Sequence, residues 1–313
     1  MVGVADDRRD LVSGLDEQGG EEEGDLAVTA EDGDAHVCHG SRVQTSTHGL
    51  TIGEHEVRKE FVADHEAEAE REWAILTLLA EHAPGLAPRP VRRDDGRTPV
   101  IVMERLPGEP LAPRPLSASQ VQALGASLRR LYDVPLAAVS DAGIGPRNGG
   151  AADPPAIIHA RLADHHDLSD CQDPELVRTA REVAREWLGD PPLPEPRQTV
   201  LGIADLNPAN VLWDGQLVRL VDFEDGGLTD PAYELADHVE HLGSRLHGVY
   251  DDRALTDAVG LDAEDRVRMA AYRPLWAAFW LAMLVPGSGS WHRNPPGTAE
   301  AQAAHFMALV GHH

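Results

Sequence analysis

Lysine is almost missing from this sequence of 313 residues. Of its 27 lysine and arginine residues only Lys59 is a lysine, and 53 aspartates and glutamates give a formal net charge of −26 at pH 7. The phosphate backbone of a nucleic acid would be repelled by this charge, which argues against nucleic acid as a partner. Twelve of the acidic residues and two arginines fall in residues 1–35, so residues 36–313 still carry a net charge of −16.

Cysteine is scarce as well. Cys38 and Cys171 are the only two cysteines, and they lie far apart and form no Cys-x-x-Cys pair. A disulfide framework is therefore not expected, and a reducing compartment fits the composition. No basic segment followed by an apolar stretch opens the chain, so we expect no signal peptide and a cytoplasmic location.

Long apolar runs are also missing. The most apolar stretch, residues 269–285, is interrupted by Arg273 and Pro274. It is short for a membrane span, which needs about 20 apolar residues. The stretch predicts a buried helix of a globular protein, and we expect no contact with a membrane.

The pattern of residue types divides the rest of the chain into three parts. Residues 1–35 are acidic and rich in glycine, which is typical of a loose segment. Residues 36–106 read as strand, strand, helix, strand, and the last strand covers Val100 to Met103. Residues 107–313 are mainly helical, with a capping box that begins at Ser117 and helices over 156–164 and 174–188. These features predict an α+β protein with a small β-rich lobe and a larger helical lobe.

The segment "IADLNPANVLWDGQLVRLVDFED" (residues 203–225) holds the densest group of chemically useful side chains. Asn210 to Trp213 read as a strand, the Asp214-Gly215 pair is a strong hairpin turn signal, and the return strand ends at Asp222. Asn210 and Asp222 would then lie opposite each other at the open end of an antiparallel hairpin. Asp205 lies on the loop that leads into it.

Oxygen-bearing side chains in this arrangement suit a magnesium site. Mg²⁺ takes one or two side-chain oxygen ligands and completes its octahedron with water and phosphate oxygens. Asn210 and Asp222 fit this requirement, and Asp205 is left to accept a proton from a substrate hydroxyl group.

The same segment resembles a known family. "DLNPANVLWDG" and "LVDFEDGGLTDPAYELA" resemble the catalytic and metal loops of aminoglycoside phosphotransferases and choline kinase-like enzymes, which are built on the protein-kinase plan. The resemblance implies a two-lobed protein-kinase-like fold, with ATP or GTP and Mg²⁺ as cofactors. It gives Asp205 the role of catalytic base, and Asn210 and Asp222 the role of holding Mg²⁺.

The resemblance also assigns residues upstream. The kinase plan needs a strand lysine that pairs with the nucleotide phosphates and a helix glutamate that holds this lysine. Lys59, the only lysine, lies on a predicted strand, and Glu72 follows it by thirteen residues, with Glu68 and Glu70 as neighbouring alternatives. The remaining nucleotide-binding residues implied by the resemblance are a phosphate-covering loop with Gly40 and Ser41 and an adenine-binding segment with Met103, Glu104 and Leu106.

Two sequence features distinguish the possible functions further. No GxxxxGK[ST] motif occurs, which excludes a P-loop, and no Ala-Pro-Glu segment follows Asp222, so a protein kinase lacks support. Ile203-Ala204 stand where the resembled families usually have His-Gly, and Asn207 stands where His is common. These departures leave a nucleotide-binding pseudokinase or regulatory protein as the alternative to an active small-molecule kinase.

The acceptor is expected to be a small cationic molecule that carries a hydroxyl group. The acidic composition favours a polyhydroxylated amine, such as an aminoglycoside-like antibiotic, and antibiotic resistance would be the corresponding role. In the resembled families the acceptor lies over the helical lobe. The carboxylates expected to face it are Asp225, Asp237 and Glu240. The sequence is compatible with a monomer or a dimer.

Overall fold

The computed structural model describes residues 41–44, 48–150 and 154–311. The chain divides at Val37 into two units, and all described residues belong to the second, Cys38–His313. The expected loose segment 1–35 and Gly40 of the phosphate-covering loop lie outside the described residues.

The first part of the described chain forms an antiparallel five-stranded sheet. Its strand order is β1 (Ser41–Gln44), β2 (Gly49–Ile52), β3 (Glu56–Glu60), β5 (Val100–Glu104), β4 (Pro90–Asp94). The predicted strand over Val100 to Met103 is confirmed as β5. The sequence did not predict β4, because "PVRRD" is mostly charged and lies at an edge of the sheet, where only one neighbouring strand is needed.

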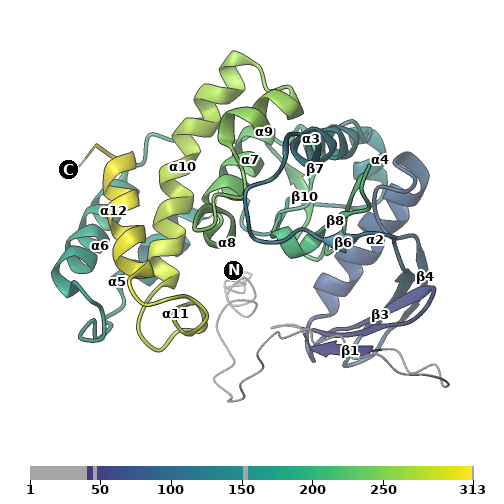
Figure 1. Ribbon diagram of the computed structural model, residues 1–313, viewed down its shortest axis with the longest axis horizontal. Helices are drawn as coiled ribbons and strands as arrows, with labels where there is room; N and C mark the ends of the chain where they lie inside the picture. The colour runs from purple at the N-terminus through teal and green to yellow at the C-terminus, as the bar shows by residue number, and fades with distance from the viewer. Residues whose placement is uncertain (1–40, 45–47, 151–153, 312–313) are drawn as a thin grey trace, which may run out of the picture. The chain divides into compact units, whose positions relative to one another are not determined.

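Helix α2 (Glu66–His82) packs against this sheet. Ile75, Leu76 and Leu79 repeat at helical spacing and are at most 1% exposed. They share the core with Phe61 and Ile101 from the sheet side. Figure 1 shows the sheet and α2 at one end of this unit and helices α5, α6, α10 and α12 at the other.

Two smaller sheets follow. One has the strand order β6 (Glu109–Pro110), β8 (Val211–Trp213), β9 (Val218–Leu220), and the other pairs β10 (Gly227–Thr229) with β7 (Val200–Gly202). The predicted hairpin is confirmed as β8 and β9, with Asn210 in a short 3-10 turn, η1 (Pro208–Asn210), just before β8. The Asp214 carboxylate accepts two backbone N–H groups in the turn, and Gly215 has a φ of 99°. Glycine adopts this left-handed conformation without steric cost.

The remainder of the described chain is helical. The helices are α3 (Ala118–Tyr132), α4 (Leu136–Asp141), α5 (Pro154–Ala163), α6 (Pro174–Gly189), α7 (Pro231–Glu240), α8 (Leu242–Arg245), α9 (Asp252–Val259), α10 (Ala263–Met283), α11 (Gly289–His292) and α12 (Thr298–Leu309). The capping box of α3 is confirmed, with both the Ser117 and the Gln120 side chain in place.

The most apolar stretch of the sequence lies in α10, as predicted. Leu275, Ala278 and Leu281 are among its buried residues, and the helix packs against α7 and α12. Pro274 lies within this helix. Among the described residues, no helix combines the length and the apolar character that a membrane crossing requires.

The close contact between helices α3 and α9 leads to a testable prediction. A Cβ atom on Gly125 of α3 would lie 2.5 Å from the Cβ of Ala258 in α9 and 2.7 Å from its carbonyl oxygen. The Gly125→Ala variant should therefore lower the free energy of unfolding by about 1–3 kcal/mol, measured by urea denaturation. Gly189→Ala is the matched control, because nothing lies within 4 Å of its added Cβ. Equal stability of both variants would contradict the close crossing.

Candidate active site

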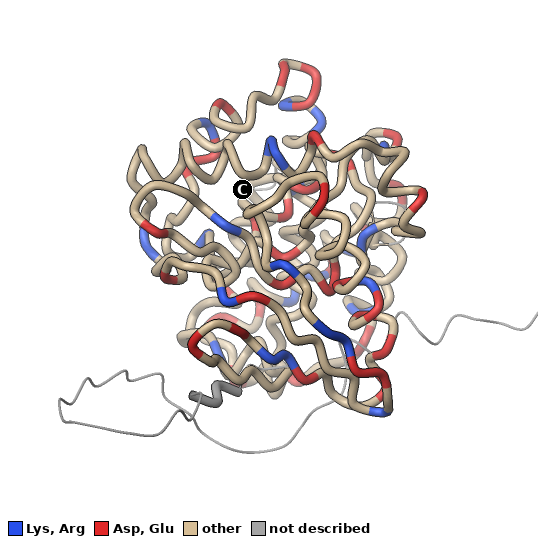
Figure 2. Tube along the Cα trace, turned by 90° about the vertical axis from the view of Figure 1, so that its right-hand side faces the viewer, with Lys and Arg blue, Asp and Glu red and all other residues tan. Residues whose placement is uncertain are grey.

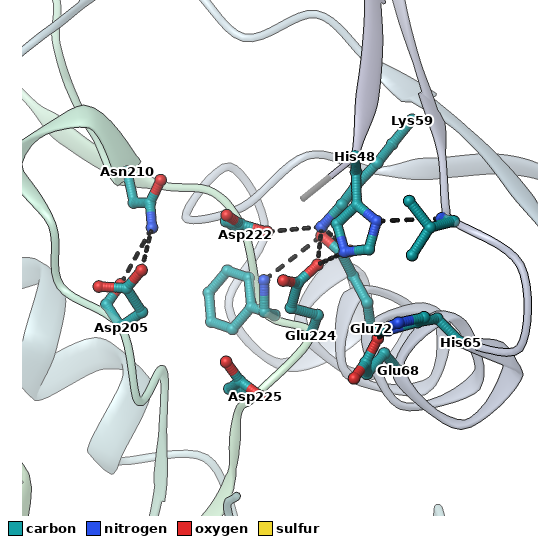
Figure 3. A network of polar contacts seen from close by, with 12 residues as sticks. His48, Lys59, His65, Glu68, Glu72, Asp205, Asn210, Asp222, Glu224 and Asp225 are labelled. Atoms are coloured by element: carbon teal, nitrogen blue, oxygen red, sulfur yellow. Dashed lines mark hydrogen bonds and ion pairs between the residues drawn. The ribbon is translucent and has the colours of Figure 1, made fainter. Parts of the chain in front are cut away.

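Lys59 is the centre of an ion cluster that joins the sheet, α2 and the segment after β9. Its Nζ lies 2.7 Å from Glu72 Oε2, 2.5 Å from Asp222 Oδ1 and 2.5 Å from Glu224 Oε2 (Figure 3). The predicted choice of Glu72 over Glu68 agrees with this geometry, since Glu68 contacts His65 instead. The cluster also includes Glu224, which the sequence did not single out.

The charges in this cluster do not balance. Three carboxylates surround one ammonium group. One oxygen from each carboxylate can be chosen so that the three lie within 4.8 Å of one another. Burial alone would lower the pKa of Lys59, but the charges of Glu72, Asp222 and Glu224 outweigh it and raise the pKa well above its usual value. Burial would raise the pKa of Glu224, but the hydrogen bond from His48 and the charge of Lys59 lower it to about 2.

A divalent cation fits this donor set. Carboxylate oxygens are the ligands that Mg²⁺ prefers, and two positive charges would offset the excess negative charge of the cluster. Asn210 lies at the end of the hairpin, where its backbone carbonyl oxygen accepts the backbone N–H of Val221 at 3.0 Å. Its Nδ2 donates to Asp205, which leaves Oδ1 as the ligand atom. The metal-binding roles of Asn210 and Asp222 stay predictions.

Asp205 lies on the loop between β7 and η1. Its Oδ1 accepts the backbone N–H of Asn207 at 3.0 Å, and its Oδ2 accepts Nδ2 of Asn210 at 3.3 Å. In Figure 3, Asp205 and Asn210 lie on one side of Asp222 and Lys59 on the other. Partial removal from water raises the pKa of Asp205 to about 6, and the negative charge of Asp222 acts in the same direction. A carboxylate with such a pKa is suited to accept a proton near neutral pH.

Ile203-Ala204 stand where the resembled families usually have His-Gly. A residue of α7 holds the backbone of these two residues by hydrogen bonds. Glu234 Oε1 accepts the backbone N–H groups of Ile203 at 2.7 Å and of Ala204 at 2.9 Å. Ala204 has a φ of 70°, a conformation that costs a non-glycine residue roughly 1–2 kcal/mol. The two hydrogen bonds hold the backbone in this conformation directly before Asp205. Gly202 leaves room for the carboxylate, because a Cβ there would lie 2.6 Å from it.

Glu234 is itself held by Arg147, which comes from the loop before α5. The guanidinium group donates to Glu234 Oε2 at 2.7 Å and to Asp237 Oδ2 at 2.5 Å. It also lies 5.4 Å from the ring centres of Tyr233 and Trp276. Arg147 and Glu234 are both almost fully buried, so each depends on the other for its charge.

The three carboxylates expected to face an acceptor have different surroundings. Asp225 is next to the ion cluster and accepts Nδ2 of Asn148 at 2.6 Å. Asp237 is bound to Arg147. The Glu240 side chain is 0% exposed and lies between Arg273 and His305. Asp237 and Glu240 are therefore already paired with protein groups, and this arrangement gives no support to the prediction that they face an acceptor.

The predicted adenine-binding segment lies at the end of β5. Met103 is 5% exposed and Leu106 is 8% exposed. The N–H of Glu104 already donates to the carbonyl of Arg89, and the N–H of Arg105 donates to that of His55. An adenine edge would have to meet other backbone groups of this segment. Ser41 begins β1, and its side chain is not described.

Several residues around the site could not be found by spacing in the sequence. His48 contacts Glu224, with 2.8 Å between Nε2 and Oε2. His241 Nε2 lies 3.8 Å from Asp205 Oδ1. Both contacts join positions far apart in the chain, so no local motif reveals them. Glu224 had a local signal, because it follows Asp222 by two residues in the quoted "VDFE".

Comparison with known proteins identifies proteins that are similar to this chain. The model of a phosphotransferase enzyme family matches residues 44–272. No curated protein sequence matches the chain. The described fold is similar to many solved structures, three of which illustrate the range.

The GDP and kanamycin complex of APH(2")-IIIa has a TM-score of 0.61 at 14% identity and covers 90% of this chain and 95% of its own. A choline/ethanolamine kinase family protein from Mesorhizobium loti has a TM-score of 0.56 at 19% identity, covering 86% of this chain and 87% of its own. Spectinomycin phosphotransferase APH(9)-Ia, in complex with ADP and spectinomycin, has a TM-score of 0.57 at 13% identity, with coverages of 87% and 89%. At these identities the likeness shows the fold, and the predicted protein-kinase-like α+β fold is confirmed.

The buried ion pair of Arg147 and Glu234 leads to a prediction about stability. Arg147→Met leaves two carboxylates without their cation and should lower the free energy of unfolding by about 3–5 kcal/mol. Arg92→Met is the matched control, because the Arg92–Asp94 pair is more than half exposed and contributes little. Chemical denaturation of both variants measures the difference. An Arg147→Met protein as stable as the control would show that the pair does not hold the loop.

Proposed function

The chain belongs to the phosphotransferase enzyme family, and we propose that it transfers the γ-phosphoryl group of ATP or GTP to a hydroxyl group of a small cationic molecule. It is a small-molecule kinase. One observation supports this proposal most directly. Lys59 contacts both Glu72 and Asp222 in one ion cluster, and Asp205 lies on a neighbouring loop.

The sheet side of the site would bind the nucleotide. We assign this role to residues 36–106, with Lys59 as the partner of the phosphates and Glu72 as the group that orients Lys59. GDP and ADP in the similar structures support the binding of a nucleotide by this chain. Asn210 and Asp222 would hold Mg²⁺, which would supply positive charge against the phosphates when bound.

Asp205 would act as the base. The acceptor hydroxyl group gives its proton to an Asp205 carboxylate oxygen, its oxygen forms a bond to the γ-phosphorus, and the bond to the β-phosphate oxygen breaks. The nucleoside diphosphate leaves with that oxygen. Asn207 and Asn210 fix the carboxylate by hydrogen bonds, so that it is oriented before the acceptor binds.

The acceptor would lie over residues 107–313. Kanamycin and spectinomycin in the similar structures, together with a choline/ethanolamine kinase relative, support a hydroxylated amine. The acidic chain supports a cationic acceptor too, although Asp and Glu are distributed along most of the trace and not gathered in one element (Figure 2). Asp225 is the carboxylate of the predicted set that remains next to the cluster. Resistance to an aminoglycoside-like antibiotic would be the corresponding role.

A pseudokinase is the weaker alternative. The departures at Ile203 and Ala204 suggested it, because neither side chain can brace the catalytic loop. Glu234 supplies the two hydrogen bonds that this loop needs, so the departures do not remove an element of the catalytic machinery. The contacts of Lys59 with Glu72 and Asp222, and that of Asp205 with Asn210, support an active kinase over this alternative.

The third prediction concerns Asp205. Asp205→Asn should lower turnover by about 10²–10⁴-fold, the usual contribution of a positioned base, and should leave nucleotide binding unchanged. Because a base acts only when deprotonated, wild-type turnover should fall as the pH drops through about 6, the raised pKa of Asp205. The assay measures transfer from ATP and GTP, with and without Mg²⁺, to aminoglycosides, spectinomycin, choline and other aminoalcohols.

Asp257→Asn is the matched control, since this side chain is 57% exposed and belongs to α9, outside the ion cluster. A folded Asp205→Asn protein that turns over as fast as this control would remove Asp205 from the role of base. A wild-type protein that transfers phosphate to none of these acceptors would count against the proposed function itself.

A further inference from the structure

His48 is a residue of the ion cluster to which neither the family resemblance nor the local motifs assign a role. It directly precedes β2, and its side chain is 3% exposed. Its Nδ1 accepts the backbone N–H of Val62 at 3.3 Å, so the ring hydrogen lies on Nε2. Nε2 donates to Glu224 Oε2 at 2.8 Å (Figure 3). The ring packs against Phe61, with 4.6 Å between the ring centres.

Lys59 has no N–H group to spare in this arrangement. An ammonium group carries three hydrogens, and Glu72, Asp222 and Glu224 each accept one of them. A phosphate oxygen that binds Lys59 must therefore replace one of these carboxylates.

Asp222 stays at the site under the proposed function, because it would hold Mg²⁺. Of the other two carboxylates, Glu224 can leave Lys59 with a smaller loss of contacts than Glu72. Glu72 is 1% exposed, and its second oxygen accepts the N–H of Phe223 at 3.3 Å, so its displacement would break two interactions inside the core. Glu224 shares one oxygen between Lys59 and His48. If it loses Lys59, it keeps the hydrogen bond from His48. A partly buried carboxylate without any donor would be costly.

We propose that His48 is a positioning residue of the nucleotide site, which retains Glu224 when a phosphate oxygen replaces Glu224 on Lys59. The proposal rests on the proposed function, because it needs a nucleotide at Lys59. The hydrogen bond from His48 stabilises Glu224 more after the phosphate oxygen has replaced it on Lys59. In the described structure, Lys59 also neutralises Glu224. Loss of His48 should consequently weaken nucleotide binding through Glu224 alone.

A double-mutant cycle tests this dependence. The affinity for ADP and for GDP, each with Mg²⁺, is measured by calorimetry for the wild type, His48→Ala, Glu224→Gln and the double variant. His48→Ala should weaken binding of the preferred nucleotide about tenfold, a typical value for a hydrogen bond to a charged group. In the Glu224→Gln background the same change should alter the affinity less than about twofold. His48→Gln, whose amide can also donate to Glu224, should stay close to the wild type.

The outcomes separate the two proposals. An equal loss of affinity from His48→Ala in both backgrounds would show a merely structural role and would overturn the assignment of His48. Unchanged affinity in the single His48→Ala variant would overturn it too. If neither nucleotide binds the wild type, the proposed function fails, and the role of His48 falls with it. Thermal unfolding of all five proteins confirms that each variant is folded.

Discussion

Three carboxylates from different parts of the chain meet one ammonium group in this protein. Lys59 comes from β3, Glu72 from α2, and Asp222 and Glu224 from the segment after β9. Removing the charge of Lys59 would leave three buried or partly buried carboxylates without their cation, which is costly in a low-dielectric environment. The cluster therefore fixes the sheet, α2 and the segment after β9 relative to one another. It also leaves an excess of negative charge, which a divalent cation would offset.

A second buried ion pair supports the catalytic loop. Glu234 accepts two backbone N–H groups of the loop that ends at Asp205, and Arg147 neutralises Glu234. The loop needs this support because Ala204 has a left-handed conformation that alanine does not favour. The position of Asp205 thus depends on Glu234 of α7 and on Arg147, which lies 87 residues before Glu234 in the chain.

The sequence predicted those parts of the site that depend on local chemistry. The distance from Asp205 to Asp222 along the chain, with a strong turn signal between them, defines a hairpin without any knowledge of the rest of the fold. The single lysine made Lys59 identifiable. The sequence could not predict which acidic side chains are already neutralised. Glu240 was expected to face an acceptor, but it is buried against Arg273, a residue 33 positions later in the chain. Partners at such distances are set by helix packing, which composition and periodicity do not encode.

The central claim is that the ion cluster around Lys59 is the place where nucleotide phosphates bind. Because Lys59 is the only lysine in the sequence, an acyl-phosphate derivative of ATP or GTP has a single lysine side chain to acylate. Mass spectrometry of the labelled protein should find the modification on Lys59, and an excess of ATP or GTP with Mg²⁺ should prevent it. Modification confined to the N-terminal amine, or labelling of Lys59 that no nucleotide reduces, would contradict the account.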